Sequence, residues 1–305
     1  MIGRMTGQGA AGVKSRSGPG NRSAAGSRAD RYKYEEEQAM DKKLAFIGCG
    51  NMASAMIGGI LDSKKVSADH VIASDVSEAG LKKAQEHFRI QTTSDNKEAA
   101  AFADVIVLSV KPQFYEEVIK EIAPSVTKEQ IIVTIAPGIT LERVEKMFGA
   151  PVKIVRTMPN TPALVCAGMT GACCNSYVNT EELNEICELL STFSRVEVVP
   201  EKLMDVVGAV SGSSPAFVFM LIEAMADAAV ADGMPRAQAY QFAGQAVMGS
   251  AKLLLESGKH PGELKDMVCS PGGTTIEGVR VLEDRGYRSA MFEALKACVK
   301  KSKDF

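Results

Sequence analysis

The chain has 305 residues, of which 46% are hydrophobic and 24% are charged, and its formal net charge is −2. This composition is ordinary for a soluble globular protein and excludes a wholly disordered chain, a collagen-like repeat and a small disulfide scaffold. The near-neutral charge gives no sign of a nucleic-acid-binding surface, so we expect no nucleic-acid partner. At ~100–200 residues per domain, the length predicts two domains.

Neither the apolar stretches nor the cysteines point to a membrane or an extracellular setting. The longest apolar stretch, residues 216–230, is interrupted by Glu223 and Asp227 and falls short of the ~20 apolar residues that a membrane span needs. The seven cysteines are irregularly spaced and form neither a Cys-x-x-Cys pair nor a Cys/His cluster with zinc spacing. We expect reduced thiols that pack as small hydrophobic groups, no metal site, no membrane partner and a cytoplasmic location.

Residues 1–40 differ in composition from the rest of the chain. The first 29 residues are rich in Gly, Ser, Ala and Arg and contain no acidic residue. Without apolar periodicity, the segment cannot bury enough surface to offset the entropy lost on ordering. It lacks the apolar region of a secretory signal, and its scattered glycines oppose the amphipathic helix of a transit peptide. We expect a disordered leader or a non-native tail over residues 1–40, with the folded chain starting near Met40.

A glycine-rich motif follows the first expected strand. The apolar run 44–47 predicts a buried parallel strand, and it is followed by Gly48–Ala53 and then by an apolar helical pattern over 55–61. The sequence Gly-x-Gly-x-x-Ala between a strand and a helix is typical of a dinucleotide-binding loop. There the first glycine allows the tight turn and the second lets a pyrophosphate approach the backbone. The alternative is a glycine turn that binds no ligand.

Four further apolar runs predict strands at residues 71–74, 105–110, 131–135 and 152–156, with helical stretches such as 78–87 and 114–122 between them. This alternation predicts right-handed crossovers and a parallel sheet, hence a Rossmann-type α/β domain over residues 41–200. Ligands bind at the carboxyl ends of such strands. The residues at those ends are Asp75, Lys111, Pro112, Gly138 and Asn160. For Lys111 the alternative is a solvated surface lysine.

From residue 201 to residue 305 the pattern predicts helices. Ser213-Ser214-Pro215 predicts an N-cap and a first-turn proline for a helix that reaches about Asp232. A second helix is expected from Pro235 to about Ser257, with Gly258 as its stop. Both helices are apolar over most of their circumference, and a helix that is apolar all round must be buried. We therefore expect an interlocked homodimer, the alternative being a monomer with a tight helical core.

The loop Ser270–Thr275 combines Ser-Pro, two glycines and two threonines directly before another expected helix, which begins at Thr274 or Thr275. The glycines free the backbone and the threonines cap the helix. We expect a nest of N–H donors that suits an anion the size of a carboxylate. The alternative is an ordinary helix-start loop.

Together these blocks, from about Leu44 to Lys300, resemble the pyrroline-5-carboxylate reductase family. The blocks that carry the resemblance are Gly48–Ala53, Val110–Pro112, Met158–Pro162, Ser211–Ala216 and Leu264–Glu283. The resemblance implies an amino-terminal Rossmann domain and a carboxyl-terminal, all-helical dimerisation domain, with dimers that often assemble into decamers. It also implies hydride transfer from NADPH or NADH to the C=N bond of 1-pyrroline-5-carboxylate, giving L-proline.

The resemblance also implies roles for individual residues. Cofactor contacts are implied for Gly48, Cys49, Gly50, Asn51, Met52, Asn96, Val110, Lys111, Pro112, Ala136 and Gly138. Substrate contacts are implied for Glu201, Gly272, Gly273, Thr274 and Thr275. Thr275 is expected to hydrogen-bond the ring nitrogen, and Lys111 is its expected catalytic companion. A cyclic imine that binds as the iminium ion is already electrophilic, so alignment and carboxylate fixation suffice and no metal is needed.

Asp75 departs from the pattern of family members that favour NADPH, which tend to carry a small hydroxyl residue at this position. An acid at the end of the second strand hydrogen-bonds the adenosine ribose hydroxyls and repels a 2′-phosphate. We therefore expect this chain to lean toward NADH.

Two other functions compete with this interpretation. A β-hydroxyacid dehydrogenase shares the two-part layout but places a catalytic lysine on a long helix, and the surroundings of Lys252, the interior lysine of the helical pair, do not match. A dinucleotide sensor without turnover would have no need of the second anion site at residues 270–275.

Overall fold

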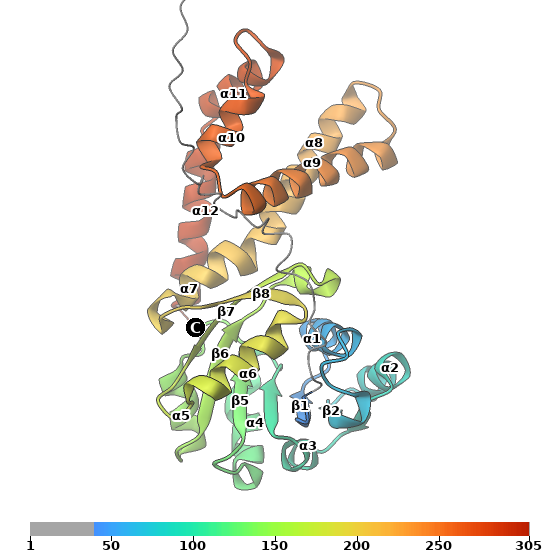
Figure 1. The fold of residues 1–305 in the computed structure, drawn as a ribbon, viewed down its shortest axis with the longest axis vertical. Helices are drawn as coiled ribbons and strands as arrows, with labels where there is room; N and C mark the ends of the chain where they lie inside the picture. Colours follow the sequence, from blue (N-terminus) through green and yellow to red (C-terminus); the bar gives the residue numbers. More distant parts are fainter. Residues whose placement is uncertain (1–39, 305) are drawn as a thin grey trace, which may run out of the picture. The chain divides into compact units, whose positions relative to one another are not determined.

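The protein is described by a computed structural model over residues 40–304, so the expected leader lies outside the described residues apart from Met40. Figure 1 shows the fold. The strands are β1 (Leu44–Ile47), β2 (Val71–Ser74), β3 (Gln91–Thr93), β4 (Val105–Leu108), β5 (Ile131–Thr134), β6 (Lys153–Met158), β7 (Gly168–Cys174) and β8 (Ser194–Val198). The helices that cover them are α1 (Asn51–Asp62), α2 (Glu78–Phe88), α3 (Asn96–Phe102), α4 (Tyr115–Ile122), α5 (Leu141–Phe148) and α6 (Thr180–Ser191).

The helices of the carboxyl-terminal part are α7 (Met204–Val207), α8 (Ser214–Ala231), α9 (Arg236–Ser257), α10 (Pro261–Val268), α11 (Thr274–Asp284) and α12 (Tyr287–Ser302). Shorter helical segments link the elements: η2 (Ala68–His70), η3 (Pro112–Phe114), η4 (Ala123–Ser125), η5 (Thr161–Val165), η6 (Glu201–Leu203) and the π-helical η7 (Gly208–Ser213).

The strands form one sheet in the order β3-β2-β1-β4-β5-β6-β7-β8. The first six are parallel neighbours in the Rossmann order, as the strand and helix alternation predicts. The expectation of a parallel sheet is wrong for β7, which runs antiparallel to β6. The physical reason is the short connection between β6 and β7. The segment between β6 and β7 contains the short η5 turn and no crossover helix, and a parallel neighbour needs such a crossover.

Each face of the sheet carries its own hydrophobic core. Side chains of α1, α2 and α6 pack on one face, and side chains of α3, α4 and α5 pack on the other. Alternate residues of a strand serve the two cores, as Leu44 and Ala45 of β1 do. Because both faces are covered, all four residues of β1, β2, β4 and β5 are buried, which explains why these strands are continuous apolar runs in the sequence.

The expected N-cap at Ser213 is wrong. Its backbone is helical, its side chain makes no capping hydrogen bond, and one continuous helix runs over Glu201–Ala231. Pro215 therefore lies inside a helix, where its missing N–H would break an ordinary α-helical ladder. The wider π turn of η7 stands immediately before Pro215 and accommodates it, since π turns shift the hydrogen-bond spacing by one residue.

The helices α8 and α9 lie side by side (Figure 1), and α9 ends at Gly258 with φ +63°, the left-handed stop that the sequence predicts. Small residues such as Ala226, Ala239 and Ala243 are buried. Large apolar side chains on the same helices remain exposed, among them Phe219 at 62% and Phe242 at 67%. By length and composition alone, the helix over Glu201–Ala231 could cross a membrane, and 11% of its most apolar 18-residue window is buried.

Candidate cofactor and substrate site

The glycine loop connects β1 to α1 and is held tightly at its first glycine. Gly48 has φ +105°, and a Cβ there would stand 2.9 Å from the carbonyl oxygen of Ser109. The Gly48 N–H donates to the Ser74 carbonyl (2.7 Å), and the Ser109 hydroxyl donates to the Gly48 carbonyl (2.8 Å). A side chain is excluded here by both backbone strain and space, which is the role that the motif predicts for its first glycine.

The amino terminus of α1 is open to an anion. Gly50 is its N-cap, no side chain caps the helix, and the first turn carries no acidic residue. A Cβ at Gly50 would meet no atom within 4 Å, so the space beside this N-cap is free. Free N–H groups and the positive end of the helix dipole suit a pyrophosphate. These residues therefore fit a dinucleotide, with Asn51 exposed and Met52 half-buried beside them.

Asp75, at the carboxyl end of β2, binds the glycine loop. Its Oδ2 accepts the backbone N–H of Cys49 at 2.7 Å, and its Oδ1 accepts the N–H of Ser77 at 2.9 Å. Each carboxylate oxygen keeps a further lone pair, so two ribose hydroxyls still find acceptors there. The neighbouring Cys49 thiol is shielded from ionisation, because burial and then the Asp75 charge raise its pKa to about 11.

Asn96 opens α3 beside the same strand end, and the protein already orients its amide. The Ser74 hydroxyl donates to Oδ1 at 2.8 Å, and Nδ2 donates to Oε2 of Glu121 at 2.7 Å. An amide with four hydrogen-bonding positions keeps capacity for a ligand. The implied cofactor contact of Asn96 remains a prediction, as do those of the other site residues.

The loops after β4 and β5 bring the remaining implied cofactor contacts to this edge. Val110 and Pro112 are half-buried, Lys111 is exposed, and Ala136 is buried. Gly138 has φ +73°, a conformation that favours glycine. Since parallel strands end at one edge, these loops lie along the same side of the sheet as the glycine loop.

A cavity of about 450 Å³ opens at this edge, within the usual size range of small-molecule sites. It is lined by five segments: Met52 of α1; Ile135 and Pro137 after β5; Met158 at the end of β6 with Pro159, Asn160 and Thr161 after it; Gly208, Ala209, Gly212 and Ser213 of η7; and Cys298, Lys301 and Ser302 of α12. We call it the strand-end cavity. Two of these lining residues are predictable from the sequence: Met52 belongs to the glycine motif, and Asn160 follows an expected strand. The wall from α12 carries no motif that would reveal it.

The loop Ser270–Thr275 leads into α11, which begins at Thr274 within the expected range, but the expected threonine cap is wrong because Thr274 and Thr275 lie inside the helix. Gly273 N donates to the Ser270 carbonyl at 3.0 Å around Pro271 and Gly272, whose φ is +66°, the arrangement of a Pro-Gly turn. Gly273 is the N-cap of α11 and no side chain caps it. Thr274 and Thr275 are exposed. None of these residues lines the strand-end cavity of the same chain.

Glu201 lies in a network of buried and half-buried charges rather than in the cavity lining. Its Oε1 accepts the N–H of Leu141 at 2.7 Å and Nη1 of Arg156 at 3.0 Å. The other side of the Arg156 guanidinium faces Asp205 Oδ1 at 3.6 Å, and Ser302 donates its hydroxyl to the same oxygen at 2.9 Å. The network joins α5, β6, α7 and α12, and the implied substrate contact of Glu201 remains a prediction.

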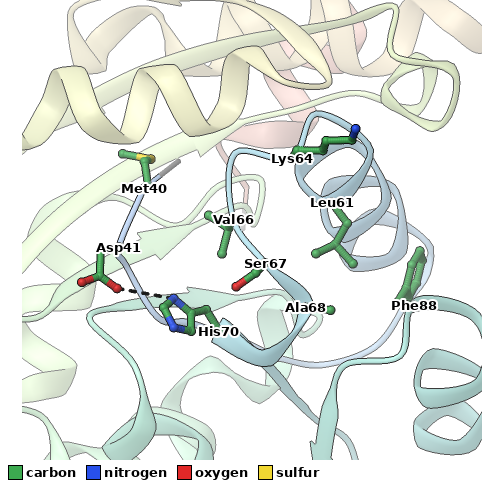
Figure 2. A pocket seen from close by; sticks show the side chains of 9 residues that line it. All are labelled: Met40, Asp41, Leu61, Lys64, Val66, Ser67, Ala68, His70 and Phe88. Carbon is green, nitrogen blue, oxygen red and sulfur yellow. Dashed lines mark ion pairs between the residues drawn. The ribbon is translucent and has the colours of Figure 1, made fainter. Parts of the chain in front are cut away.

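A second hollow lies at the opposite ends of the strands. Figure 2 shows its lining, which includes Met40 and Asp41 before β1, Leu61 of α1 and Phe88 of α2. His70 faces Asp41 across it, with 3.7 Å between Nδ1 and Oδ1. It is remote from the glycine loop in the fold, because its residues precede the strands that end at that loop.

Two further features bear on the competing functions. Within residues 40–304, no group of three His, Cys, Asp or Glu side chains is placed to hold a metal ion. Lys252 has a 68% exposed side chain and faces Glu256 one helical turn away at 3.7 Å, which is the arrangement of a solvated surface lysine.

Comparison with known proteins identifies the family. Residues 201–305 match the family model described as pyrroline-5-carboxylate reductase dimerisation, and residues 43–138 match one described as NADP oxidoreductase, coenzyme F420-dependent. Pyrroline-5-carboxylate reductase of Escherichia coli is 50% identical over 263 residues, which is 86% of this chain and 98% of that protein. The enzyme of Methanosarcina acetivorans is 40% identical over 87% of this chain and 98% of its own length. The chain belongs to the pyrroline-5-carboxylate reductase family.

Solved structures agree with this assignment. Plasmodium falciparum pyrroline carboxylate reductase with NADP bound matches with a TM-score of 0.81 at 30% identity, covering 88% of this chain and 99% of that one. The enzyme of Coxiella burnetii matches with a TM-score of 0.79 at 34% identity, covering 86% and 98%. The expected fold, a Rossmann-type sheet followed by an all-helical dimerisation region, is confirmed.

Proposed function

We propose that the chain reduces the C=N bond of 1-pyrroline-5-carboxylate with NADPH or NADH and releases L-proline, the last step of proline biosynthesis. The observation that carries the proposal is membership of this family together with an open α1 terminus beside a cavity at the same sheet edge. In the overall reaction, the imine takes up one hydride and one proton, and the reduced nicotinamide becomes NAD(P)⁺.

The bound nicotinamide supplies the hydride, and the residues of the chain provide position and charge. The first-turn N–H groups of α1 would hold the pyrophosphate, and Asp75 would accept from the adenosine ribose. Met52, in the same first turn, lines the strand-end cavity, which would receive the nicotinamide. The loop Ser270–Thr275 holds the carboxylate with backbone N–H groups, while Thr275 hydrogen-bonds the ring nitrogen.

The site is completed by a second copy of the chain. The substrate loop does not line the cavity of its own chain, and large apolar side chains of α8 and α9 are exposed. Covering those faces with a second dimerisation region brings a neighbouring loop toward the sheet edge. We further propose that such dimers assemble into decamers, which the mass in solution tests, and that the enzyme works in the cytoplasm.

Initial rates with purified full-length protein test the function. Absorbance of the reduced nicotinamide should fall when pyrroline-5-carboxylate is added, with either cofactor, and L-proline should accumulate in equal amount. A protein that binds the dinucleotide but leaves the absorbance unchanged would instead support the sensor hypothesis. Turnover of a 3-hydroxyacid with NAD(P)⁺ and none of the imine would support the dehydrogenase hypothesis.

A further inference from the structure

The π-helical segment η7 is unusual because it stands where Pro215 interrupts the hydrogen-bond ladder. Proline has no N–H to give to the carbonyl of Ser211, four residues earlier. That half-buried carbonyl therefore loses its α-helical donor, and a substitute partner stabilises it. Ser211 and Ser214 also return their hydroxyls to the carbonyls of Val207 and Val210, contacts that bend helices.

Asn160 supplies the missing donor. Its Nδ2 donates to the Ser211 carbonyl at 2.9 Å, and its Oδ1 accepts the backbone N–H of Met169 at 2.8 Å. The amide orientation is fixed by both partners, because one neighbour can only accept and the other can only donate. The side chain is 8% exposed, so water competes little for either contact. Three segments are thus joined at one amide: the loop after β6, the start of β7, and η7.

This joint shapes the strand-end cavity. Asn160 lines the cavity, as do Gly208 and Gly212 of η7 and Met158, the last residue of β6. The Met158 methyl group packs against both glycines, where an added Cβ would stand 3.2 and 3.3 Å from it. Because Met158 and the two glycines are already in close contact, a shift of η7 also displaces Met158 and changes the cavity wall.

We propose that Asn160 is a positioning residue for the reaction. It holds the π turn before Pro215 against the strand-end loop and so fixes the wall at which the nicotinamide and pyrroline rings meet. This rests on the proposed function. Displacing that wall misaligns the rings but leaves the adenosine half of the cofactor site, at Asp75 and Asn96, intact.

The variant Asn160→Asp tests the role, because it keeps the shape and replaces the donor with an oxygen facing the Ser211 carbonyl. We expect a folded protein whose kcat/KM for the imine falls about tenfold or more, whereas the cofactor Kd changes less than about twofold. Asn179→Asp is the matched control: Asn179 caps α6 by accepting from the Glu182 N–H, which aspartate does equally well. Its kinetics should equal those of wild type.

A second variant covers the case in which Asn160→Asp fails to fold. Pro215→Ala gives the Ser211 carbonyl a helical donor, so the turn can relax toward α geometry and release Asn160. We expect unchanged or higher Tm with lower kcat/KM for the imine. Unchanged kcat/KM in a folded Asn160→Asp, or parallel losses of cofactor binding and kcat/KM, would overturn the proposal. If Asn160→Asp does not fold, unchanged kcat/KM in Pro215→Ala overturns it.

Failure of the proposed function is distinguishable from failure of this role. A wild-type protein without imine turnover contradicts the function alone. Hydrogen exchange of residues 208–213 then decides the positioning role, since it must accelerate in Asn160→Asp and remain unchanged in Asn179→Asp. Equal exchange in both variants overturns the role.

Discussion

The Asp75 carboxylate and the Cys49 backbone N–H form a 2.7 Å hydrogen bond that ties the end of β2 to the glycine loop. One side chain therefore orders the glycine loop, and it also places a negative charge at the end of β2, where we propose that the adenosine ribose binds.

The charge of Asp75 should set cofactor preference. In Asp75→Ser, the ratio of kcat/KM for NADPH to that for NADH should rise about fivefold, because a repulsion of ~1 kcal/mol between Asp75 and a 2′-phosphate is removed. Taking the ratio cancels any general loss from a looser loop. Asp69→Ser, which removes the same charge at the other end of β2, should leave the ratio unchanged. A wild type that strongly prefers NADPH, with the same ratio in Asp75→Ser, would contradict the expectation.

The two glycines of the loop should fail in different ways. Gly48→Ala should lower the free energy of unfolding by ~2 kcal/mol or more, since its φ is +105° and its Cβ would clash with Ser109. Gly50→Ala should keep nearly the wild-type Tm, because φ is −68° and the space around it is empty. Its cofactor Kd should nevertheless rise about tenfold or more, as the methyl group occupies the approach of the pyrophosphate. Wild-type cofactor affinity in Gly50→Ala would show that the pyrophosphate does not approach this backbone.

Removing the hydroxyl of Thr275 should impair the reaction without unfolding the chain. In Thr275→Ala we expect kcat/KM for the imine to fall about three- to tenfold, the loss of one hydrogen bond, and Thr275→Ser should restore most of it. Thr180→Ala, an exposed threonine in the first turn of α6, is the control for helix-start effects. Equal kinetics of Thr275→Ala and wild type would remove Thr275 from the site.

Glu201→Gln should reduce stability. The glutamine still accepts the N–H of Leu141, but it no longer neutralises Arg156, whose side chain is 6% exposed. We expect the free energy of unfolding, from denaturant titration, to fall by ~1–3 kcal/mol. An unchanged value would mean that Asp205 alone satisfies the guanidinium. The KM for the imine, measured on the same variant, tests the implied substrate contact separately.

The Cys49 thiol should resist alkylation. With a pKa raised to about 11, its thiolate fraction at pH 8 is about 10⁻³, so iodoacetamide should modify the exposed Cys166 well before Cys49 in peptide maps. The sign for stability follows from the same shift. A folded-state pKa above the unfolded value of 9.0 contributes stability below pH 9 that is lost as pH rises toward 11. Cys49→Ala should therefore show a shallower fall of Tm over that range.

The sequence predicts the central parallel strands well and the remaining strands poorly. The runs 44–47 and 71–74 coincide with β1 and β2, because strands buried on both faces must be continuously apolar. The edge strand β3, Gln91–Thr93, has three polar side chains and gives no such signal. The interior strand β7, Gly168–Cys174, consists mostly of small residues and gives no strand pattern either, since its place in the sheet depends on its pairing with β6.

In the candidate site too, the features that depend on neighbouring residues are predictable, and those that depend on tertiary contacts are not. The glycine loop and Asp75 are local signals, since strand, turn and helix follow one another directly in the chain. The strand-end cavity depends on residues far apart in the sequence, since Cys298 of its α12 wall lies 140 positions after Met158. Ser-Ser-Pro is a good N-cap signal and predicts a helix start, whereas the tertiary contact of Asn160 with Ser211, which helps to support the continued helix, leaves no local signal.

The uncovered apolar sides of α8 and α9 couple the stability of each subunit to its abundance. Association that buries Phe219 and Phe242 adds to the stability of the fold by mass action, so a dilute preparation melts at a lower temperature than a concentrated one. In a cell, a newly made subunit that has not yet associated exposes this apolar surface, which chaperones bind and proteases recognise. The amount of associated enzyme, and with it the amino acid that the enzyme supplies, would then rise more than proportionally with the rate of subunit synthesis.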